Sequence, residues 1–125
     1  IIDFDQIEGN LLGILVEGFG RFKVKNSWEE KDHLLMGEVE PIKDEADCKL
    51  LENDGALVKI LKELVKHPMV EKLKLGIDYS NGVDVSYRLT ELLPLDLTVK
   101  QSLLELVDTQ QRLLELNKLV KGFQK

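Results

Sequence analysis

The stretch that decides the fold is residues 88–116, which read RLTELLPLDLTVKQSLLELVDTQQRLLEL. Leucines at helical spacing run up to Pro94, whose ring and missing N–H prevent the helix from continuing. After a short extended linker, Thr98 and Gln101 have the spacing of a capping box, which predicts the start of a second helix. Asp108 predicts the start of a third helix. This stretch therefore indicates a leucine-rich helical bundle.

The helical part is expected to cover residues 54–125, after an acidic and irregular linker over residues 43–53. One further helix is predicted from about Asn53 to Lys66, and another begins at a cap on Asn81. Each predicted helix has one apolar face, which we expect to be buried. The members of these faces are Leu57, Ile60, Leu61, Leu64 and Val65, then Val85, Leu89, Leu92 and Leu93, then Val99, Leu103, Leu106 and Val107, and finally Leu113, Leu116, Leu119, Val120 and Phe123.

Residues 1–42 are predicted to be β-structure. Phe4 alternates with Asp3 and Asp5, and residues 11–16 are a nearly continuous apolar run, typical of a strand buried on both faces. Turn signals between the apolar runs predict an antiparallel meander of about four strands. The expected fold class is therefore α+β, with an antiparallel β subdomain followed by a helical bundle.

Around Phe22 the sequence alternates between apolar and basic side chains. Phe22 and Val24 are interleaved with Arg21, Lys23 and Lys25. Because alternate side chains of a strand point to opposite faces, the pattern predicts that Phe22 and Val24 are buried and that the basic side chains face water. A basic strand face also suggests RNA binding as an alternative function, although an ordinary solvent-facing strand fits an acidic protein better.

The charge balance argues against two classes of partner. The chain has 125 residues, with 17 Lys and Arg against 23 Asp and Glu, a net charge of −6. Nucleic acids and anionic membranes both attract basic surfaces, so neither is an expected partner. No apolar run approaches the ~18 residues needed to span a bilayer. Cys48 is the single cysteine, which suits a reducing compartment and predicts a cytoplasmic location.

No pattern predicts a catalytic or metal site. His33, His67 and Cys48 are too few and too scattered for the three or four ligands of a zinc site. The chain has no Gly-rich phosphate loop and no recognisable nucleophile–base pair, so we expect no cofactor and no enzymatic activity. Acid–base chemistry would need carboxylates in a pocket, whereas we expect the acidic run before and within the linker to be solvated. Its members are Glu38, Glu40, Asp44, Glu45 and Asp47.

Residues 88–116 closely resemble the helical end of the amino-terminal domain of Lon proteases. That family shows the same order of leucines, Pro-Leu, a capping residue, Lys-Gln, Leu-Leu-Glu-Leu, Asp and Arg-Leu. The β part resembles the family at residues 21–24, Arg-Phe-Lys-Val, and 39–42, Val-Glu-Pro-Ile. The middle, notably residues 86–95, is most similar to stand-alone bacterial proteins made only of this domain. The resemblance extends over residues 11–120.

The chain also departs from that family. The usual Leu-Pro-Leu-Phe-Pro-Leu opening and the following Ile-Phe-Glu-x-x-Tyr helix are not found in this sequence. The resemblance therefore implies an incomplete PUA-like barrel, and we expect the chain to be a fragment. Strands cut from a larger sheet leave unpaired backbone groups, so we also expect pairing with another copy, strand swapping or a separate amino-terminal piece rather than a simple monomer.

The resemblance implies a non-catalytic module that recognises unfolded or extended polypeptide. Such recognition uses strand addition and pockets for side chains. Phe19, Trp28 and Met36 are the candidate peptide-binding residues. Trp28 is expected in a polar loop over residues 26–32, where it either anchors a peptide or caps the barrel. A structural or oligomerisation module without peptide binding is the main alternative, and RNA binding through a PUA-like fold is another.

Overall fold

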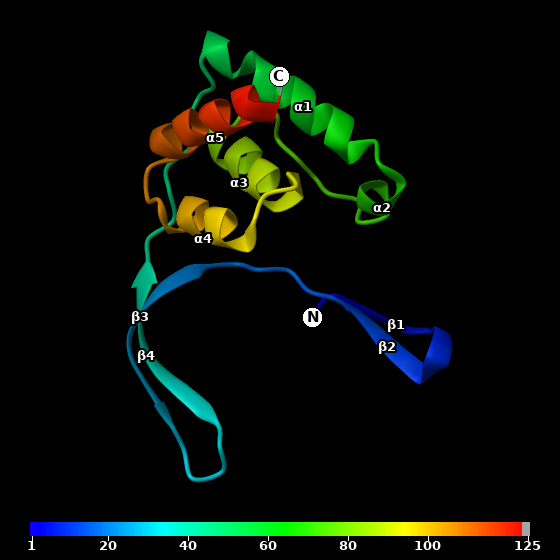
Figure 1. Cartoon of the computed structure of the whole chain (residues 1–125), viewed down its shortest axis with the longest axis vertical. Coiled ribbons are helices and arrows are strands. Elements are labelled where there is room, and N and C mark those ends of the chain that lie inside the picture. Colours follow the sequence, from blue (N-terminus) through cyan, green and yellow to red (C-terminus); the bar gives the residue numbers. More distant parts are fainter. Residues whose placement is uncertain (124–125) are drawn as a thin grey trace. The chain divides into compact units, whose positions relative to one another are not determined.

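The computed structural model describes residues 1–123. Its elements follow in the order β1 (Asp3–Ile7), η1 (Glu8–Asn10), β2 (Leu11–Leu15), β3 (Arg21–Glu29), β4 (Leu35–Ile42), η2 (Glu52–Asp54), α1 (Gly55–Val65), α2 (Pro68–Glu71), α3 (Gly82–Leu92), α4 (Leu97–Glu105) and α5 (Thr109–Phe123), as Figure 1 shows. The predicted α+β class is confirmed.

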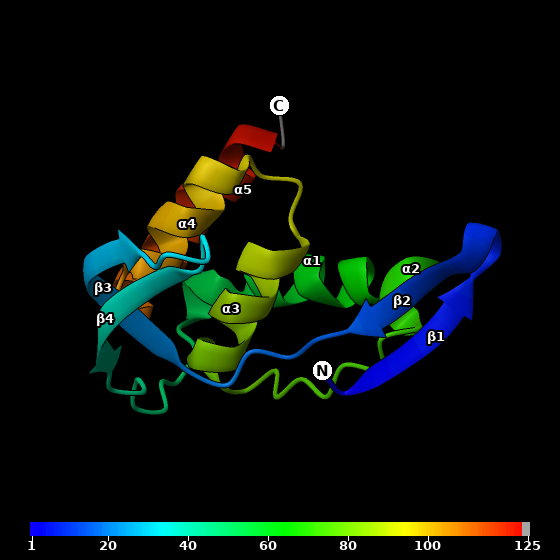
Figure 2. The same ribbon diagram turned by 90° about the horizontal axis from the view of Figure 1, so that it is seen from below.

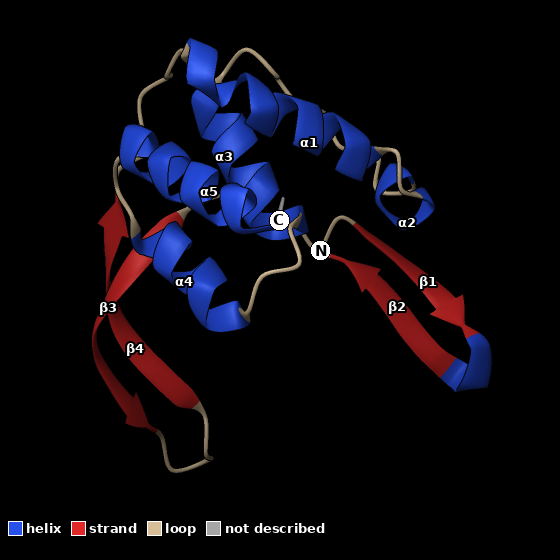
Figure 3. Cartoon of the chain, turned by 45° about the horizontal axis from the view of Figure 1, so that its top comes forward, coloured by secondary structure: helices blue, strands red, loops and turns tan. Residues whose placement is uncertain are grey.

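The chain divides into two compact units. The first is Ile1–Asp44 and contains all the named strands, and the second is Glu45–Lys125 and contains the α-helices, as the colours of Figure 3 make clear. We describe each unit by itself.

The β unit consists of two antiparallel hairpins. β1 pairs with β2 and β3 pairs with β4, each pair forming a two-stranded sheet. The prediction of a continuous meander is therefore wrong, because β2 and β3 do not pair. No residue of this unit is buried, so the predicted burial of residues 11–16 on both faces is also wrong.

The predicted burial of Phe22 and Val24 is wrong for the same reason. Their exposed fractions are 59% and 54%. Lys23 and Lys25 are exposed as predicted, whereas Arg21 is half-buried. A two-stranded sheet has no neighbouring strands to extend its faces, and this one buries none of its side chains in a core. Alternation tells which residues share a face, but it does not tell whether anything covers that face.

Trp28 does not lie in a loop. β3 continues to Glu29, and the chain reverses between Glu30 and Leu34, where the N–H of Glu30 donates to the Leu34 carbonyl over 2.8 Å. His33 occupies the left-handed region in this turn, with a φ of 67°. Residues 26–29 therefore belong to an exposed strand. The loop prediction failed because an exposed strand can be as polar as a loop.

The helical unit is built around α3, which packs against α1, α4 and α5 (Figures 1 and 2). Its core is formed by apolar side chains that the sequence placed on the inner faces of the helices. The buried residues are Leu57, Leu61, Val85, Leu89, Leu93, Leu103, Leu113, Leu116 and Val120. Of the other expected members, Val107 is exposed in the connection between α4 and α5, and the side chain of Phe123 lies outside the described part of the structure.

Two of the three helix starts that were predicted from capping residues are correct. The Asn81 side chain accepts the Val83 N–H over 3.0 Å at the start of α3, and the Asp108 carboxylate accepts the Gln110 N–H over 3.0 Å before α5. The predicted start at Thr98 is wrong, because Asp96 is the N-cap of α4. Its carbonyl accepts the Lys100 N–H over 3.0 Å, so the helix begins two residues earlier.

Candidate polypeptide-binding surface

The β3–β4 hairpin presents an uncovered apolar face. Phe22 lies opposite Pro41 and Val24 lies opposite Val39, so the four side chains share one side of the ladder. A bulge at Lys25 follows, where the register shifts between Val24 and Asn26. Phe22, Val24 and Val39 are all exposed, which makes this side suited to contact with another molecule.

The other side of the same hairpin is mixed. Lys23 lies opposite Glu40, and Trp28 lies opposite Met36. Lys25 Nζ lies 3.4 Å from a carboxylate oxygen of Glu40, so basic and acidic charges offset each other here. The structure therefore brings two of the three candidate residues, Trp28 and Met36, together as cross-strand neighbours.

The third candidate, Phe19, belongs to neither ladder. It lies in the connection between β2 and β3 and is 100% exposed. Trp28 and Met36 are less exposed, at 46% and 38%, and the Trp28 indole Nε1–H donates to a carboxylate oxygen of Glu30 over 3.0 Å. Each of the three is accessible, and only the pair on the ladder forms a surface.

The β1–β2 hairpin has a second apolar face. Phe4 lies opposite Ile14, and Gln6 lies opposite Leu12, which gives one side of this ladder three exposed apolar side chains and no charge. The opposite side carries Asp3 and Asp5 on β1. The two sides of this hairpin thus differ sharply in charge.

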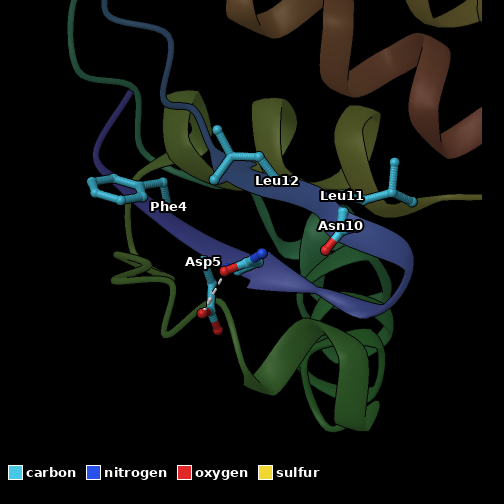
Figure 4. Close-up of a pocket in the computed structure, with 6 residues that line it drawn as sticks. Phe4, Asp5, Asn10, Leu11 and Leu12 are labelled. Atoms are coloured by element: carbon cyan, nitrogen blue, oxygen red, sulfur yellow. Dashed lines mark hydrogen bonds between the residues drawn. The ribbon is translucent and has the colours of Figure 1, made fainter.

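A shallow pocket of about 300 Å³ lies against this hairpin (Figure 4). Its wall combines apolar side chains with a carboxylate and two amides. The lining residues are Phe4, Asp5, Gln6, Asn10, Leu11 and Leu12. Pockets that hold a ligand are commonly apolar with a few placed polar groups, although this one is open rather than enclosed.

The edge of β1 has a distinctive hydrogen-bonding pattern. Asp3 accepts the N–H of Phe4 and Asp5 accepts the N–H of Gln6, each over 2.8 Å. The second of these bonds is drawn in Figure 4. Within residues 1–123, β1 has β2 as its single neighbouring strand, so its other edge is open. The alternation at Asp3 and Asp5 predicts a strand but gives these residues no functional role. The available signal was the lack of any Lys or Arg among the first 20 residues.

In the helical unit, the buried Arg112 side chain forms an ion pair with Glu45, whose carboxylate is almost completely covered. The guanidinium Nη1 and Nη2 donate to the two carboxylate oxygens over 3.0 and 2.9 Å, and the side chains are 0% and 6% exposed. Tyr87 and Thr109 also donate to Glu45, over 2.6 and 2.5 Å. The prediction that Glu45 is solvated is therefore wrong.

This arrangement controls the ionisation of Glu45. Burial alone would raise the pKa of its carboxyl group. Hydrogen bonds from Arg112, Thr109 and Tyr87, together with the Arg112 charge, outweigh burial and lower the pKa from 4.5 to about 2. The Arg112 guanidinium also stacks 4.4 Å from the centroid of the Tyr87 ring. A carboxylate so firmly ionised and so fully bonded supports the fold and is unsuited to proton transfer.

Residues 1–123 contain neither a membrane-spanning helix nor a cluster of metal-binding side chains. None of the helices there is long and apolar enough to cross a membrane. In the same residues, no group of three or more His, Cys, Asp or Glu side chains is arranged to hold a metal ion. Cys48 is a free, half-buried thiol that accepts a bond from the Gln110 amide over 3.4 Å.

The two sheets have open edges and exposed apolar faces, and such surfaces are suited to contact with another polypeptide. Comparison with known families agrees. Residues 1–122 match the model of the ATP-dependent protease La (LON) substrate-binding domain, and the chain belongs to this family. The resemblance predicted from the sequence is confirmed, and membership supports a general role in substrate recognition by a domain that is itself non-catalytic.

The fold is also similar to a solved structure, that of a Lon N-terminal domain protein from Xanthomonas campestris. The TM-score is 0.72 and the sequence identity is 29%, over 93% of this chain and 62% of that chain. The present chain thus spans less than two thirds of the length of that protein. No curated protein matches this chain.

Proposed function

We propose that this chain binds unfolded or extended polypeptide through its β unit and performs no chemistry on it. The observation that carries the proposal is that both sheets are two-stranded, with open edges and exposed apolar faces, in a member of a substrate-binding family. An extended peptide that adds to an open strand gains backbone hydrogen bonds, and its alternate side chains meet the exposed faces. A folded protein has already satisfied its backbone groups and would gain less.

The proposal assigns roles to the candidate residues. Trp28 and Met36 form a cross-strand pair that can contact an apolar side chain, since aromatic and Met side chains are common at recognition surfaces. Phe19, fully exposed between the two hairpins in sequence, is proposed as a separate anchor.

The test is binding to a permanently unfolded polypeptide. Fluorescein-labelled, reduced and carboxymethylated α-lactalbumin would be titrated with the chain and followed by anisotropy. The double variant Phe22→Ser/Val24→Ser and the single variant Trp28→Ala should each weaken binding several-fold. Leu97→Ser is the matched control, because Leu97 is an apolar side chain 82% exposed on the helical unit. Equal affinity for all variants would contradict binding through the β unit.

A second candidate function is self-association through the open β edges, which would make the chain an assembly module. The observation that favours it is the same pair of open-edged sheets, since unpaired strands readily pair with another copy. Sedimentation velocity over a 100-fold range of concentration, set at about 1–100 μM, separates the two functions. If the chain stays monomeric at all concentrations and still binds the unfolded polypeptide, self-association is ruled out and polypeptide recognition is retained.

The proposal includes no nucleic-acid partner, no membrane partner and a cytoplasmic location. A net charge of −6 and the pairing of Lys25 with Glu40 support the first of these, because phosphate binding needs uncompensated basic groups. It also includes no hydrolysis of ATP or protein. A coupled ATPase assay and a casein-hydrolysis assay would test that point. Turnover of either substrate by the purified chain would contradict it.

A further inference from the structure

Asn81 and Gly82 form the single Asn-Gly dipeptide of the chain. The other four asparagines are followed by Leu11, Ser27, Asp54 and Lys118. Asparagine is a labile residue, because its side-chain amide can be attacked by the backbone nitrogen of the next residue. Glycine has no Cβ and obstructs this attack least. Of the five asparagines, Asn81 is therefore the one most prone to deamidation on chemical grounds.

The fold requires both residues at this point. Asn81 caps α3 by accepting the Val83 N–H. Gly82 is buried, and a Cβ at this position would lie 3.1 Å from the Cys48 carbonyl oxygen and 3.2 Å from Leu113 Cδ1. The labile dipeptide is thus a consequence of the way α3 begins against Cys48.

The folded structure holds the two reacting atoms apart. Asn81 has a ψ of 116°, which places the Gly82 nitrogen beside the Asn81 Hα and away from the side-chain carbon Cγ that it would attack. The Gly82 N–H donates to the Cys48 carbonyl over 2.6 Å. The Asn81 amide is held as well, because its oxygen accepts the Cys48 N–H over 3.4 Å and its Nδ2 donates to Asp47 over 3.2 Å. The attack therefore requires residues 47 and 48 to separate from the start of α3.

We propose that Asn81 is a deamidation site that the folded helical unit protects, and that it reacts when residues 45–49 separate from the start of α3. The Gly82 nitrogen then forms a bond to Asn81 Cγ, the Cγ–Nδ2 bond breaks, and ammonia leaves with the proton that the Gly82 nitrogen gives up. Water opens the resulting succinimide ring. If the new N–Cγ bond breaks, residue 81 becomes aspartate. If the original peptide bond breaks instead, residue 81 becomes isoaspartate.

Either product weakens the contacts that protected the site. An aspartate at position 81 lacks the amide donor to Asp47 and places a second carboxylate beside it, so that like charges repel. An isoaspartate lengthens the main chain by one methylene directly before Gly82, so the cap and the helix lose their original spacing. A chain that has once opened for long enough is thus permanently marked, and it is less stable when it folds again.

The ion pair between Arg112 and Glu45 controls how often this opening occurs. Glu45 lies two residues before Asp47, and both of its carboxylate oxygens accept bonds from the Arg112 guanidinium, over 3.0 and 2.9 Å. Loss of these bonds frees the start of the segment that covers Gly82. A slow reaction that occurs in the open state alone proceeds at a rate proportional to the population of that state.

Peptide mapping by mass spectrometry of the full chain follows the reaction. Trypsin releases residues 75–88, which contain Asn81 and no other asparagine, and deamidation exchanges NH for O in this peptide. In mildly alkaline buffer we expect deamidation to be at least about 10-fold slower than in urea above the unfolding midpoint, and to accelerate as urea is added below the midpoint. Equal rates in the folded and unfolded chain would overturn the protection. Lack of deamidation in urea would overturn the site itself.

The variant Arg112→Met should accelerate the reaction in buffer several-fold or more. The control Lys118→Met also removes one cation from α5, but Lys118 is exposed and pairs with Glu115 at the surface, so the rate should not change. An unchanged rate in Arg112→Met would overturn the role of residues 45–49. If this variant does not fold, the urea series of the unchanged chain still decides whether opening controls the reaction.

The deamidated chain can be separated from the unmodified chain by ion exchange, since it carries one additional negative charge. It should unfold at a lower urea concentration than the unmodified chain, because the cap and the bond to Asp47 are altered. Equal unfolding midpoints would overturn the inference that deamidation destabilises the refolded chain.

Discussion

Arg112 joins three separate parts of the helical unit through hydrogen bonds. Besides its two bonds to Glu45, its Nε donates to the Leu103 carbonyl over 2.9 Å and its Nη2 donates to the Leu106 carbonyl. Those carbonyls are at the end of α4, so one guanidinium joins the residue that begins the helical unit to the connection between α4 and α5. Its Nη1 also donates to the Ser86 hydroxyl oxygen over 3.4 Å, so all five N–H donors of the guanidinium have partners.

The variant Arg112→Met should therefore lower the free energy of unfolding by about 3–5 kcal/mol, because it leaves the Glu45 carboxylate buried without its cation. Urea unfolding followed by far-ultraviolet circular dichroism measures the change. Combining Arg112→Met with Glu45→Gln should recover part of the loss, since the uncompensated charge is then gone. A double variant as unstable as the sum of the two single variants would contradict this explanation.

Acid should weaken the same ion pair in a defined range. The folded-state pKa of Glu45, about 2, lies below the ordinary value of 4.5. The stability that this group contributes is therefore fully present above pH ~4.5 and is lost as the pH falls from ~4.5 toward 2, by roughly 3 kcal/mol in all. In Glu45→Gln this part of the pH dependence should be missing. Unfolding curves between pH 7 and pH 2.5 provide the measurement, and parallel curves for both proteins would refute it.

At the scale of elements, Asn81 does more than cap α3. Its side-chain oxygen accepts the N–H groups of Val83 and Cys48 over 3.0 and 3.4 Å, and its amide donates to Asp47 over 3.2 Å. It thereby ties the segment before η2 to the start of a helix. The next residue, Gly82, donates its N–H to the Cys48 carbonyl over 2.6 Å, and a Cβ there would lie 3.1 Å from the same oxygen.

We predict that Asn81→Ala lowers the free energy of unfolding by about 1–2 kcal/mol, the usual cost of a lost N-cap. Asn81→Ser should cost less, because a hydroxyl oxygen can still accept the Val83 N–H. Thermal and urea unfolding of the two variants would be compared with the unchanged chain. If Ser is as damaging as Ala, the bonds to Asp47 and Cys48 matter more than the cap.

The helices were more predictable than the strands, and the difference has a physical reason. Asn81, Pro94 and Asp108 act on their immediate neighbours, so short-range chemistry was enough to find their helix boundaries. The Thr98 prediction failed because α4 begins at Leu97, after Asp96, and the Asp96 side chain makes no capping hydrogen bond that a sequence pattern could reveal. The exposure of Phe22 depends on whether a second layer covers it, which no local pattern contains.

In the candidate site, too, local features could be predicted from the sequence and contacts between distant residues could not. Trp28 was proposed as an aromatic residue of a polar loop, whereas the structure places it on β3. Its pairing with Met36 follows from the register of β3 and β4, which the sequence did not predict. Glu45 was misjudged because its partner Arg112 lies 67 residues away along the chain. Contacts over such separations depend on how the helices pack.

For the whole molecule, the burial pattern makes the two units unequal in stability. Every buried apolar residue among residues 1–123 lies between Leu57 and Val120, and none lies in Ile1–Asp44. Isolated two-stranded hairpins are marginal in water, whereas a packed set of helices can fold alone. The helical unit therefore supplies the cooperative unfolding of the chain.

A fragment of residues 45–125 should accordingly fold by itself and keep the unfolding midpoint of the full chain within about 4–8 °C, the shift that corresponds to ~1 kcal/mol for a domain of this size. Differential scanning calorimetry of the fragment and the full chain gives the comparison. As a control, the fragment carrying Arg112→Met should lose stability as the full chain does. A fragment that fails to unfold cooperatively would show that the β unit contributes to the core.

The position of Glu45 also determines where tension would enter the helical unit. Lys43 and Asp44 alone separate this anchored residue from Ile42, the last residue of β4. Force applied to a polypeptide bound at the β3–β4 hairpin would be transmitted along β4. It would reach the bidentate ion pair between Glu45 and Arg112 of α5 after two intervening residues. The force would then pass through Arg112 to the leucine core of the helical unit. The two-residue connection, Lys43 and Asp44, is too short to extend far before this happens.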